Sequence, residues 1–160
     1  MSAGEVVLRE RGVRLKRLES IGNRLARSLR PGDLVLLYGP LGAGKTTLVR
    51  SIASALKVAD AVRSPSFTIA NIYHGSITVQ HLDLYRLEEI VDEDALALEE
   101  YAREDSVTLV EWPQAGVGRL GPASWIVRIE HESLHARSIE IEAVTSEAAD
   151  SWERAGGVDA

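Results

Sequence analysis

The alternation of apolar and polar residues divides the first third of the chain into a helix, a strand and a second helix. Residues 33–39, DLVLLYG, form an almost continuous apolar run, which is typical of a central strand covered on both faces. A helical pattern follows over 46–58, after a glycine-rich turn. Before the strand, residues 13–29 repeat apolar side chains at the helical spacings of three and four. These apolar residues are Leu15, Leu18, Ile21, Leu25 and Leu29.

Shorter apolar runs predict further strands. EVVLRE over 5–10 indicates a short first strand, and the runs SITVQHLD over 76–83 and VTLVEW over 107–112 indicate two more. An acidic helix is expected near 93–104, between the last two strands. Strands that alternate with helices favour an α/β fold.

The C-terminal part carries a different pattern. Residues 125–130 and 137–144 alternate apolar and polar side chains, which predicts an antiparallel hairpin. Charge at its outward positions favours a place at the edge of the sheet. The last stretch, 145–160, is small and polar apart from Trp152, so we expect a flexible tail or a short, loosely attached helix. One domain is therefore expected over 1–144.

Composition and charge narrow the class of protein. The chain has 160 residues, 45% of them hydrophobic, which is enough for one domain with its own core. A net charge of −6 argues against direct binding of nucleic acid by the whole molecule. The absence of cysteine excludes disulfides and thiolate metal sites. No segment approaches the roughly 18 to 20 apolar residues that cross a membrane, so we expect a cytoplasmic protein with no membrane partner.

The residues GPLGAGKT, 39–46, carry the most specific chemical signal. They match the pattern G-x-x-x-x-G-K-[ST] between an apolar strand and a helix, which is the context that a phosphate-binding loop requires. In such a loop the glycines let backbone N–H groups face phosphate oxygens, Lys45 reaches the β- and γ-phosphates, and the Thr46 hydroxyl binds Mg²⁺. The alternative, an ordinary glycine-rich turn, is the weaker interpretation in this context. The predicted nucleotide-binding residues are Gly39, Leu41, Gly42, Ala43, Gly44, Lys45, Thr46 and Thr47.

Two acidic residues, Asp83 and Glu111, stand at the ends of predicted strands. Phosphoryl transfer needs a carboxylate near Mg²⁺ and a group that orients the attacking water or acceptor. Because the carboxyl ends of parallel strands face the ligand, both acids are expected to point toward the crevice of the glycine-rich loop. With Thr46 they are the predicted metal ligands, and with Lys45 they are the predicted catalytic residues.

Other interpretations of these strand ends stay open. Asp83 is a favoured helix N-cap and can combine that role with metal binding. Glu111 can be a solvent-exposed acid just beyond the sheet edge, although acids are depleted in strands. His81 shares a strand face with Asp83 and is more typical of a partly buried, hydrogen-bonded histidine than of a catalytic one. The stretch SPSFTIANIY, 64–73, fits a turn before a strand and a nucleotide-sensing switch loop equally well.

Four segments together resemble the bacterial TsaE family, the small P-loop ATPases required for threonylcarbamoyladenosine modification of tRNA. They are LLYGPLGAGKTTLVR, SPSFTIANIY, HLDLYRL and VEWP, in this order, and the resemblance runs from about Leu18 to Val144. It implies a three-layer P-loop NTPase fold with a mixed, mainly parallel sheet that binds ATP and Mg²⁺. It also implies a weak ATPase that acts with the TsaD and TsaB subunits, with tRNA held by the complex.

By position, the resemblance assigns Ser66 to a switch motif that contacts the nucleotide. It assigns Asp83 to the metal and catalytic site and Glu111 to a Walker B-like role. The chain departs from the family at Pro40, where the family usually has Asp or Glu, and at Ser66, where it often has Thr. The first departure leaves open what that side chain contacts, and the second preserves the hydroxyl.

Two other functions remain in competition. A small nucleoside or nucleotide kinase is expected to carry an acceptor pocket and an arginine-rich lid. Between the helix after the glycine-rich loop and Glu111, the sequence offers only Arg63, Arg86 and Arg103. The other competitor is a binding module in which the nucleotide state sets the affinity for a partner.

Overall fold

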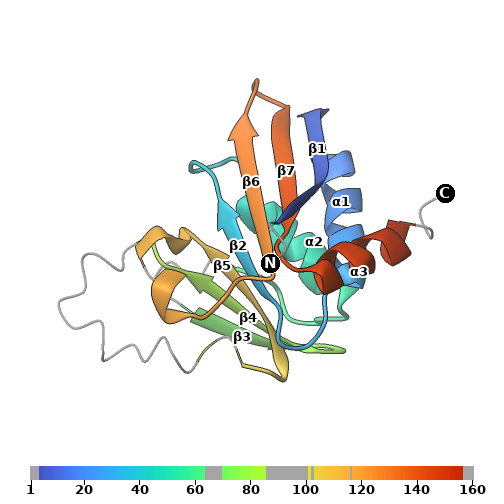
Figure 1. The fold of residues 1–160 in the computed structure, drawn as a ribbon. Coiled ribbons are helices and arrows are strands. Elements are labelled where there is room, and N and C mark those ends of the chain that lie inside the picture. Colours follow the sequence, from blue (N-terminus) through green and yellow to red (C-terminus); the bar gives the residue numbers. More distant parts are fainter. Residues whose placement is uncertain (1–3, 64–69, 86–100, 102, 116, 157–160) are drawn as a thin grey trace.

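The computed structural model describes residues 4–63, 70–85, 101, 103–115 and 117–156 (Figure 1). Within these residues the chain forms one seven-stranded sheet in the order β1-β7-β6-β2-β5-β4-β3. The strands are β1 (Glu5–Val13), β2 (Leu34–Tyr38), β3 (Ala70–His74), β4 (Thr78–Asp83), β5 (Ser106–Glu111), β6 (Trp125–His131) and β7 (Arg137–Ala143). The α-helices are α1 (Leu15–Ser28), α2 (Lys45–Ala55) and α3 (Ser146–Gly156), and two short 3-10 helices are η4 (Pro113–Ala115) and η5 (Val117–Arg119).

The sheet is mixed. Strand β2 pairs in parallel with β5 and with β6, and β4 pairs in parallel with β5. Strand β3 runs antiparallel to β4, β7 runs antiparallel to β6, and β1 runs antiparallel to β7. Strands β1, β2, β4, β5 and β6 therefore share one direction. The pairing confirms the predicted mixed, mainly parallel sheet and its C-terminal hairpin.

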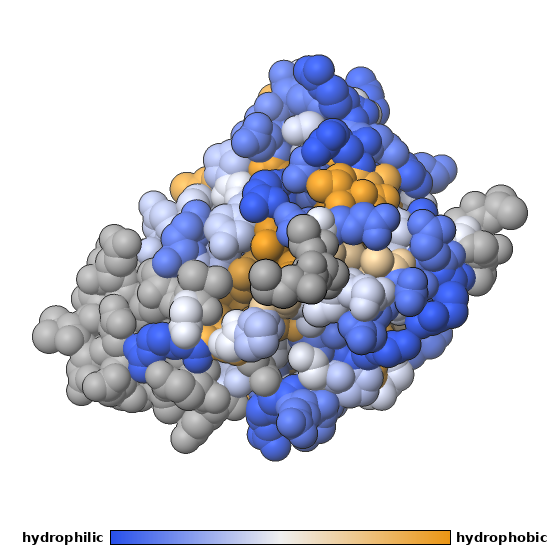
Figure 2. Space-filling model, viewed as in Figure 1, coloured by the Kyte–Doolittle hydropathy of each residue, from blue (hydrophilic) through white to orange (hydrophobic). Residues whose placement is uncertain are grey.

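The predicted position of that hairpin at the sheet edge is wrong. Strand β1 pairs along β7, so the hairpin lies between β2 and β1. The charged outward positions face solvent across the open face of these strands instead. There Arg9 Nε lies 3.0 Å from Glu140 Oε2, and Arg128 Nη1 lies 3.7 Å from oxygens of Glu140 and Glu142. Figure 2 shows the upper part of the molecule, over β6, β7 and β1, as mainly hydrophilic.

Strand β2 has the residues of a central strand because both of its faces are covered. Val35 and Leu37 belong to the large core cluster that also contains the buried residues of the helices. Leu34 and Leu36 point to the opposite face, into a smaller cluster with Leu82 of β4. The unbroken apolar run is therefore explained by burial on two sides.

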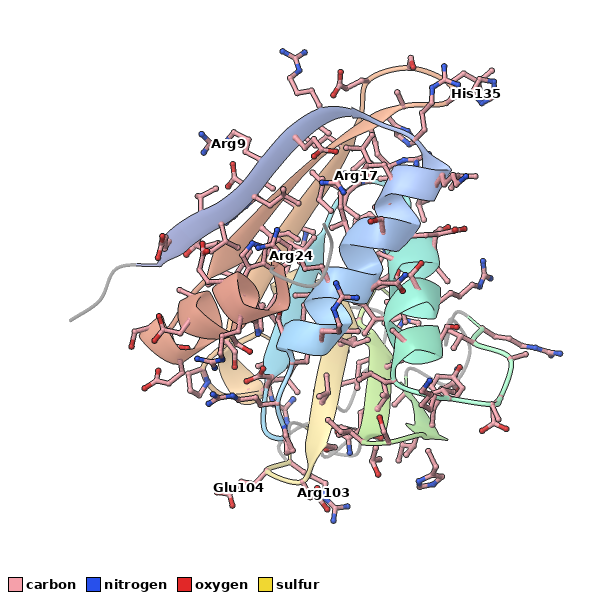
Figure 3. The ribbon with its side chains drawn as sticks, turned by 90° about the vertical axis from the view of Figure 1, so that its right-hand side faces the viewer. Arg9, Arg17, Arg24, Arg103, Glu104 and His135 are labelled. Atoms are coloured by element: carbon pink, nitrogen blue, oxygen red, sulfur yellow. The ribbon has the colours of Figure 1, made fainter. Side chains whose placement is uncertain are left out.

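The three α-helices form one layer on one face of the sheet, with α1 packed between α2 and α3 (Figure 3). Leu18, Ile21 and Leu25 of α1 are buried, as the helical spacing predicts. Leu15, on the same predicted stripe, is 54% exposed because it lies at the first residue of the helix. Among the residues that the structure describes, no helix is long and apolar enough to span a bilayer.

The C-terminal segment Ser146–Gly156 forms the short helix α3, one of the two forms expected from the sequence, but it packs on α1 instead of being loosely attached. The Trp152 ring is 2% exposed, and the guanidinium carbon of Arg24 lies 4.0 Å from its centroid. Ser151 Oγ donates a hydrogen bond to the carbonyl oxygen of Ser28 at 2.6 Å. One large aromatic residue on a helix of small residues therefore anchors this segment to the domain.

The opposite face of the sheet is covered over β2, β4 and β5 by a cluster that includes Leu120, just after η5. The structure thus shows an α/β fold with a mixed sheet, and the α-helices that it describes lie on one side. The acidic helix expected near 93–104 lies mostly outside the described residues. The predicted nucleotide contact Ser66 lies outside them as well.

Candidate functional site

The glycine-rich loop 39–46 connects the end of β2 to the start of α2 in a conformation that needs glycine. Gly44, the N-cap of α2, has a φ of 116°, in the region that side chains disfavour. Gly39 packs so closely on β6 that a Cβ there would collide with the carbonyl oxygen of Ile129. His131 Nε2, at the end of β6, lies 3.2 Å from the carbonyl oxygen of Leu41. The loop is therefore held against the end of β6.

Lys45 is buried at the first position of α2, with 4% of its surface exposed. Its Nζ donates a hydrogen bond to the carbonyl oxygen of Gly39 and lies 3.4 Å from the centroid of the Trp112 ring. Burial lowers the pKa of Lys45, and the nearby carboxylates of Glu111 and Asp83 oppose that effect. The side chain therefore closes the loop on itself and keeps its ammonium group between a carbonyl, an aromatic face and two acids.

Thr46 and Glu111 are joined directly across the site. Thr46 Oγ1 lies 3.2 and 3.1 Å from the two carboxylate oxygens of Glu111, which is 3% exposed at the end of β5. His81 of β4 is fully buried, and its Nε2 lies 2.6 Å from Glu111 Oε2. Its Nδ1 has no hydrogen-bond partner among the described residues. His81 is thus a buried, partnered histidine that orients Glu111.

Asp83 lies beside Glu111, because the two residues are register partners in the parallel pair β4–β5. Its Oδ1 accepts a hydrogen bond from the backbone N–H of Tyr85 at 3.0 Å, the local bond that an aspartate makes at the start of a turn. Burial raises the pKa of Asp83, the Tyr85 N–H lowers it, and the negative charge of Glu111 raises it further. Asp83 therefore orders the local chain and also faces the other acid.

The predicted residues meet around a cavity of about 190 Å³. Its lining consists of Leu41, Gly42, Gly44, Lys45, Thr46, Thr47, Asp83, Glu111 and Trp112. Gly39 and Ala43 do not line it: Gly39 packs against β6, and the Ala43 side chain points into the core. The strand-end argument thus brings both acids to the glycine-rich loop. The roles of the individual residues stay predictions.

Trp112 lines the cavity, and sequence reasoning did not single it out. It follows Glu111 directly, and its φ of 52° is a left-handed conformation that is unusual for a bulky residue. This backbone turns the indole back over Lys45, where the Tyr85 ring also contacts it at a centroid distance of 4.8 Å. The only sequence feature that points to this position of the indole is an aromatic residue directly after the acid at the end of a strand. Strained residues of this kind gather at ligand sites.

The oxygen atoms at this site fit a hard cation such as Mg²⁺. The described residues contain no cluster of three or more His, Asp or Glu side chains placed to hold a metal ion. Mg²⁺ does not require one, because it commonly takes one or two carboxylates, with waters and substrate phosphates as its other ligands. Thr46 and Glu111, with Asp83 beside them, supply such a partial set.

Comparison with known proteins agrees with this architecture. The family described as "Threonylcarbamoyl adenosine biosynthesis protein TsaE" matches residues 13–139. A Streptomyces coelicolor protein named tRNA threonylcarbamoyladenosine biosynthesis protein TsaE is 42% identical over 71% of this chain and 78% of its own length. The protein of the same name from Bacillus subtilis is 39% identical over 66% of each chain.

A solved structure is similar over the whole chain. The crystal structure of YdiB from Bacillus subtilis has a TM-score of 0.82 and 28% sequence identity, covering 100% of both chains. The family match spans the glycine-rich loop, both strand-end acids and most of the sheet. The chain belongs to the TsaE family.

Proposed function

We propose that this chain acts in the biosynthesis of threonylcarbamoyladenosine in tRNA, as a protein that binds and hydrolyses ATP with Mg²⁺. Family membership supports the pathway. The observation that carries the ATP part is the contact between Thr46 and Glu111, at 3.1 Å, beside the glycine-rich loop. A hydroxyl in the first helical turn, held by a carboxylate on the neighbouring strand, is the arrangement that a phosphate-bound Mg²⁺ uses in P-loop proteins.

The loop and Lys45 are proposed to bind the phosphates. The N–H groups at the start of α2 and the partial positive charge of its N-terminus favour an anion there. Lys45 Nζ would exchange the Gly39 carbonyl and the Trp112 ring for phosphate oxygens. Bound Mg²⁺ would help to neutralise the negative charge of the phosphates.

The two acids are proposed to have different roles. Glu111 is proposed as the metal-side carboxylate, because its contacts with Thr46 and His81 hold it in place. Asp83 is proposed to orient the attacking water and accept its proton on the carboxylate. Its pKa is raised by burial, which moves it toward the range useful for a general base.

The proposed ATPase is slow without its partners. None of the described residues that line the cavity is an arginine, and Arg86 lies outside the described residues. An arginine supplied in trans raises hydrolysis by about 10³ to 10⁵ in other P-loop enzymes. We propose that the TsaD and TsaB subunits bind near this cavity and complete the site, with tRNA held by the assembly.

The test is phosphate release by the chain alone, with TsaD and TsaB, and with tRNA added. We expect slow hydrolysis alone and stimulation by the two subunits, and Lys45→Met should abolish both. Formation of threonylcarbamoyladenosine in the tRNA is measured in parallel. Rapid phosphorylation of a small nucleoside by the chain alone, without stimulation by the subunits, would support the kinase instead.

A further inference from the structure

Positive charge is concentrated in one part of the chain. Residues 14–57 carry nine basic and two acidic residues, whereas all other positions together carry nine basic and 22 acidic residues. The net charge of −6 is therefore the sum of a basic segment and a strongly acidic remainder. Charge asymmetry of this kind is typical of chains that bind a polyanion through one surface, so the total charge does not describe what this segment binds.

The basic segment contains α1 and α2, and seven of its nine cations are exposed on or directly beside these helices. On α1, Lys16, Ser20, Asn23 and Arg27 follow one another at spacings of four, three and four, which places them on one stripe of the helix. This stripe contains no acidic residue, and the exposed Arg30 follows the end of the helix. The outer side of α1 therefore presents cations and hydrogen-bonding groups to solvent.

Two more cations lie on the neighbouring helix. Helices α1 and α2 are side by side in the helix layer (Figure 3), and a Cβ on Gly22 of α1 would lie only 2.6 Å from the Cβ of Ser51 of α2. Arg50 is exposed on α2, and Lys57 is exposed just after it. The cations of the two helices therefore belong to one surface, which we call the α1–α2 basic face. It is formed by Arg27, Arg30, Arg50 and Lys57.

A polar groove of about 480 Å³ lies between the two helices. Its lining residues are Leu15, Glu19, Asn23, Thr47, Arg50, Ser51 and Ser54. Amide, hydroxyl and guanidinium groups supply most of this lining, and such groups commonly hydrogen-bond the phosphate and sugar oxygens of nucleic acids. Glu19 is the only acidic residue of α1, and α2 contains none. The groove therefore suits the backbone of a polyanion.

The α1–α2 basic face lacks the anchors of a protein–protein interface. Both helices are described in full and contain no aromatic residue, and Leu15 is their only large apolar side chain that is exposed. Stable protein interfaces have aromatic and other apolar side chains at their core, whereas a phosphate backbone requires mainly cations and hydrogen-bond donors. On the other side of α1, helix α3 exposes acids that repel phosphates. They are Glu147, Asp150 and Glu153.

From these observations we propose that the α1–α2 basic face binds the phosphate backbone of tRNA. Its four cations pair with phosphate oxygens, and Asn23 and the hydroxyls of the groove hydrogen-bond the sugar–phosphate chain beside them. The inference rests on the proposed role of the chain in tRNA modification and adds a direct RNA contact to that role. Because the contacts are few and exposed, the chain alone binds tRNA weakly, and the assembly with TsaD and TsaB supplies the remaining contacts.

Salt-dependent binding of tRNA tests the proposal. The fluorescence anisotropy of a labelled, unmodified tRNA transcript is followed while the chain is added, at KCl concentrations from about 50 to 200 mM. Four phosphate contacts should weaken wild-type binding by roughly 50- to 150-fold across this range. The basic-face variant combines Arg27→Gln, Arg30→Gln, Arg50→Gln and Lys57→Gln. Its affinity at the lowest salt should be at least about tenfold weaker, and most of the salt dependence should be lost.

A second fourfold variant controls for net charge. It combines Arg9→Gln, Arg11→Gln, Arg128→Gln and Arg154→Gln, which remove the same charge from exposed positions of β1, β6 and α3. At the highest salt this control should bind tRNA as the wild type does, because salt screens distant exposed charges. Glutamine is a good helix former, so both variants should stay folded, which circular dichroism checks. Equal losses of tRNA affinity in the two variants would overturn the proposal.

Activity measurements separate this inference from the proposed function. The basic-face variant should hydrolyse ATP as the wild type does, because none of its four positions lines the cavity at the glycine-rich loop. With TsaD and TsaB, it should need at least about tenfold more tRNA to reach the half-maximal rate of modification.

Three other outcomes are decisive. A wild type that neither hydrolyses ATP nor supports tRNA modification would reject the proposed function and this inference with it. Normal modification by the wild type, together with unchanged tRNA affinity in the basic-face variant, would reject the RNA contact alone. If the basic-face variant lost binding to TsaD and TsaB and kept its tRNA affinity, the face would be a site for an acidic protein surface and the RNA proposal would be wrong.

Discussion

The replacement Glu111→Gln tests the assignment of the metal-side carboxylate, because glutamine keeps the shape of the side chain and removes its charge. Thr46 and His81 both hydrogen-bond to this carboxylate, at 3.1 and 2.6 Å. A bond to a charged group contributes about 1.5 to 3 kcal/mol and a neutral one about 0.5 to 1.5 kcal/mol, so the two bonds together weaken by roughly 2 kcal/mol. The amide is easier to bury than a charge. The free energy of unfolding should therefore change by less than about 2 kcal/mol.

Catalysis should change far more than stability. Loss of a preorganised group that stabilises transition-state charge typically costs about 10² to 10³ in kcat, and we expect at least this loss in single-turnover hydrolysis of ATP. ATP affinity should be measured with Mg²⁺ and with EDTA. The gain in affinity that Mg²⁺ gives to the wild type should shrink in Glu111→Gln, whereas Glu147→Gln, in the first turn of α3, should behave as the wild type. An undiminished Mg²⁺ gain together with undiminished turnover would refute the role.

Three other substitutions test neighbouring features. Because burial raises the pKa of Asp83, its contribution to stability is present at low pH and is lost as the pH rises through the folded-state pKa. Thermal melts should therefore show Asp83→Asn gaining Tm relative to the wild type as the pH rises above the usual titration range of an aspartate, while its ATP turnover falls. A lower Tm at all pH values with normal turnover would leave only the turn-forming role. ATP should change the tryptophan fluorescence of the wild type but not of Trp112→Phe, because the other two tryptophans, Trp125 and Trp152, are buried in the core; a signal retained in Trp112→Phe would contradict this. Trp152→Ala should lower the free energy of unfolding by about 3 to 5 kcal/mol, and denaturant titration checks this; a loss under about 1 kcal/mol would mean that α3 is not anchored by its tryptophan.

The central strand and the glycine-rich loop were predictable because the residues that indicate them are adjacent in the sequence. The run 33–39 shows burial on both faces, and the loop after it carries its own spacing of glycines, lysine and threonine. The proximity of Asp83 and Glu111 was predictable because the carboxyl ends of parallel strands lie at the same edge of a sheet. It required only that β4 and β5 lie on the same side of β2.

The remaining features depend on contacts between residues that are far apart in the chain. The small residues of α3 resemble a polar tail until Trp152 meets Arg24 of α1. No local sequence pattern indicates that β1 pairs with β7, so the sequence predicts the hairpin at the edge of the sheet. The position of the Trp112 ring over Lys45 depends on the left-handed backbone conformation of Trp112 itself. Arg137 shares the parity of the buried residues Ile139 and Ile141 of β7, and only the structure shows that it lies against Gly44.

The pairing of β1 with β7 also sets the order in which a newly made chain can fold. Arg9 and its partner Glu140 are 131 positions apart, and at about 5 to 20 residues per second the ribosome needs roughly 7 to 26 s to join them. For most of that time β2 also lacks at least one of its neighbours, because β5 and β6 begin only at Ser106 and Trp125. Within the described sheet only the hairpins β3–β4 and β6–β7 form from nearby residues. The glycine-rich loop is made before β5 and β6, so it acquires its supporting strands only after both have been synthesised.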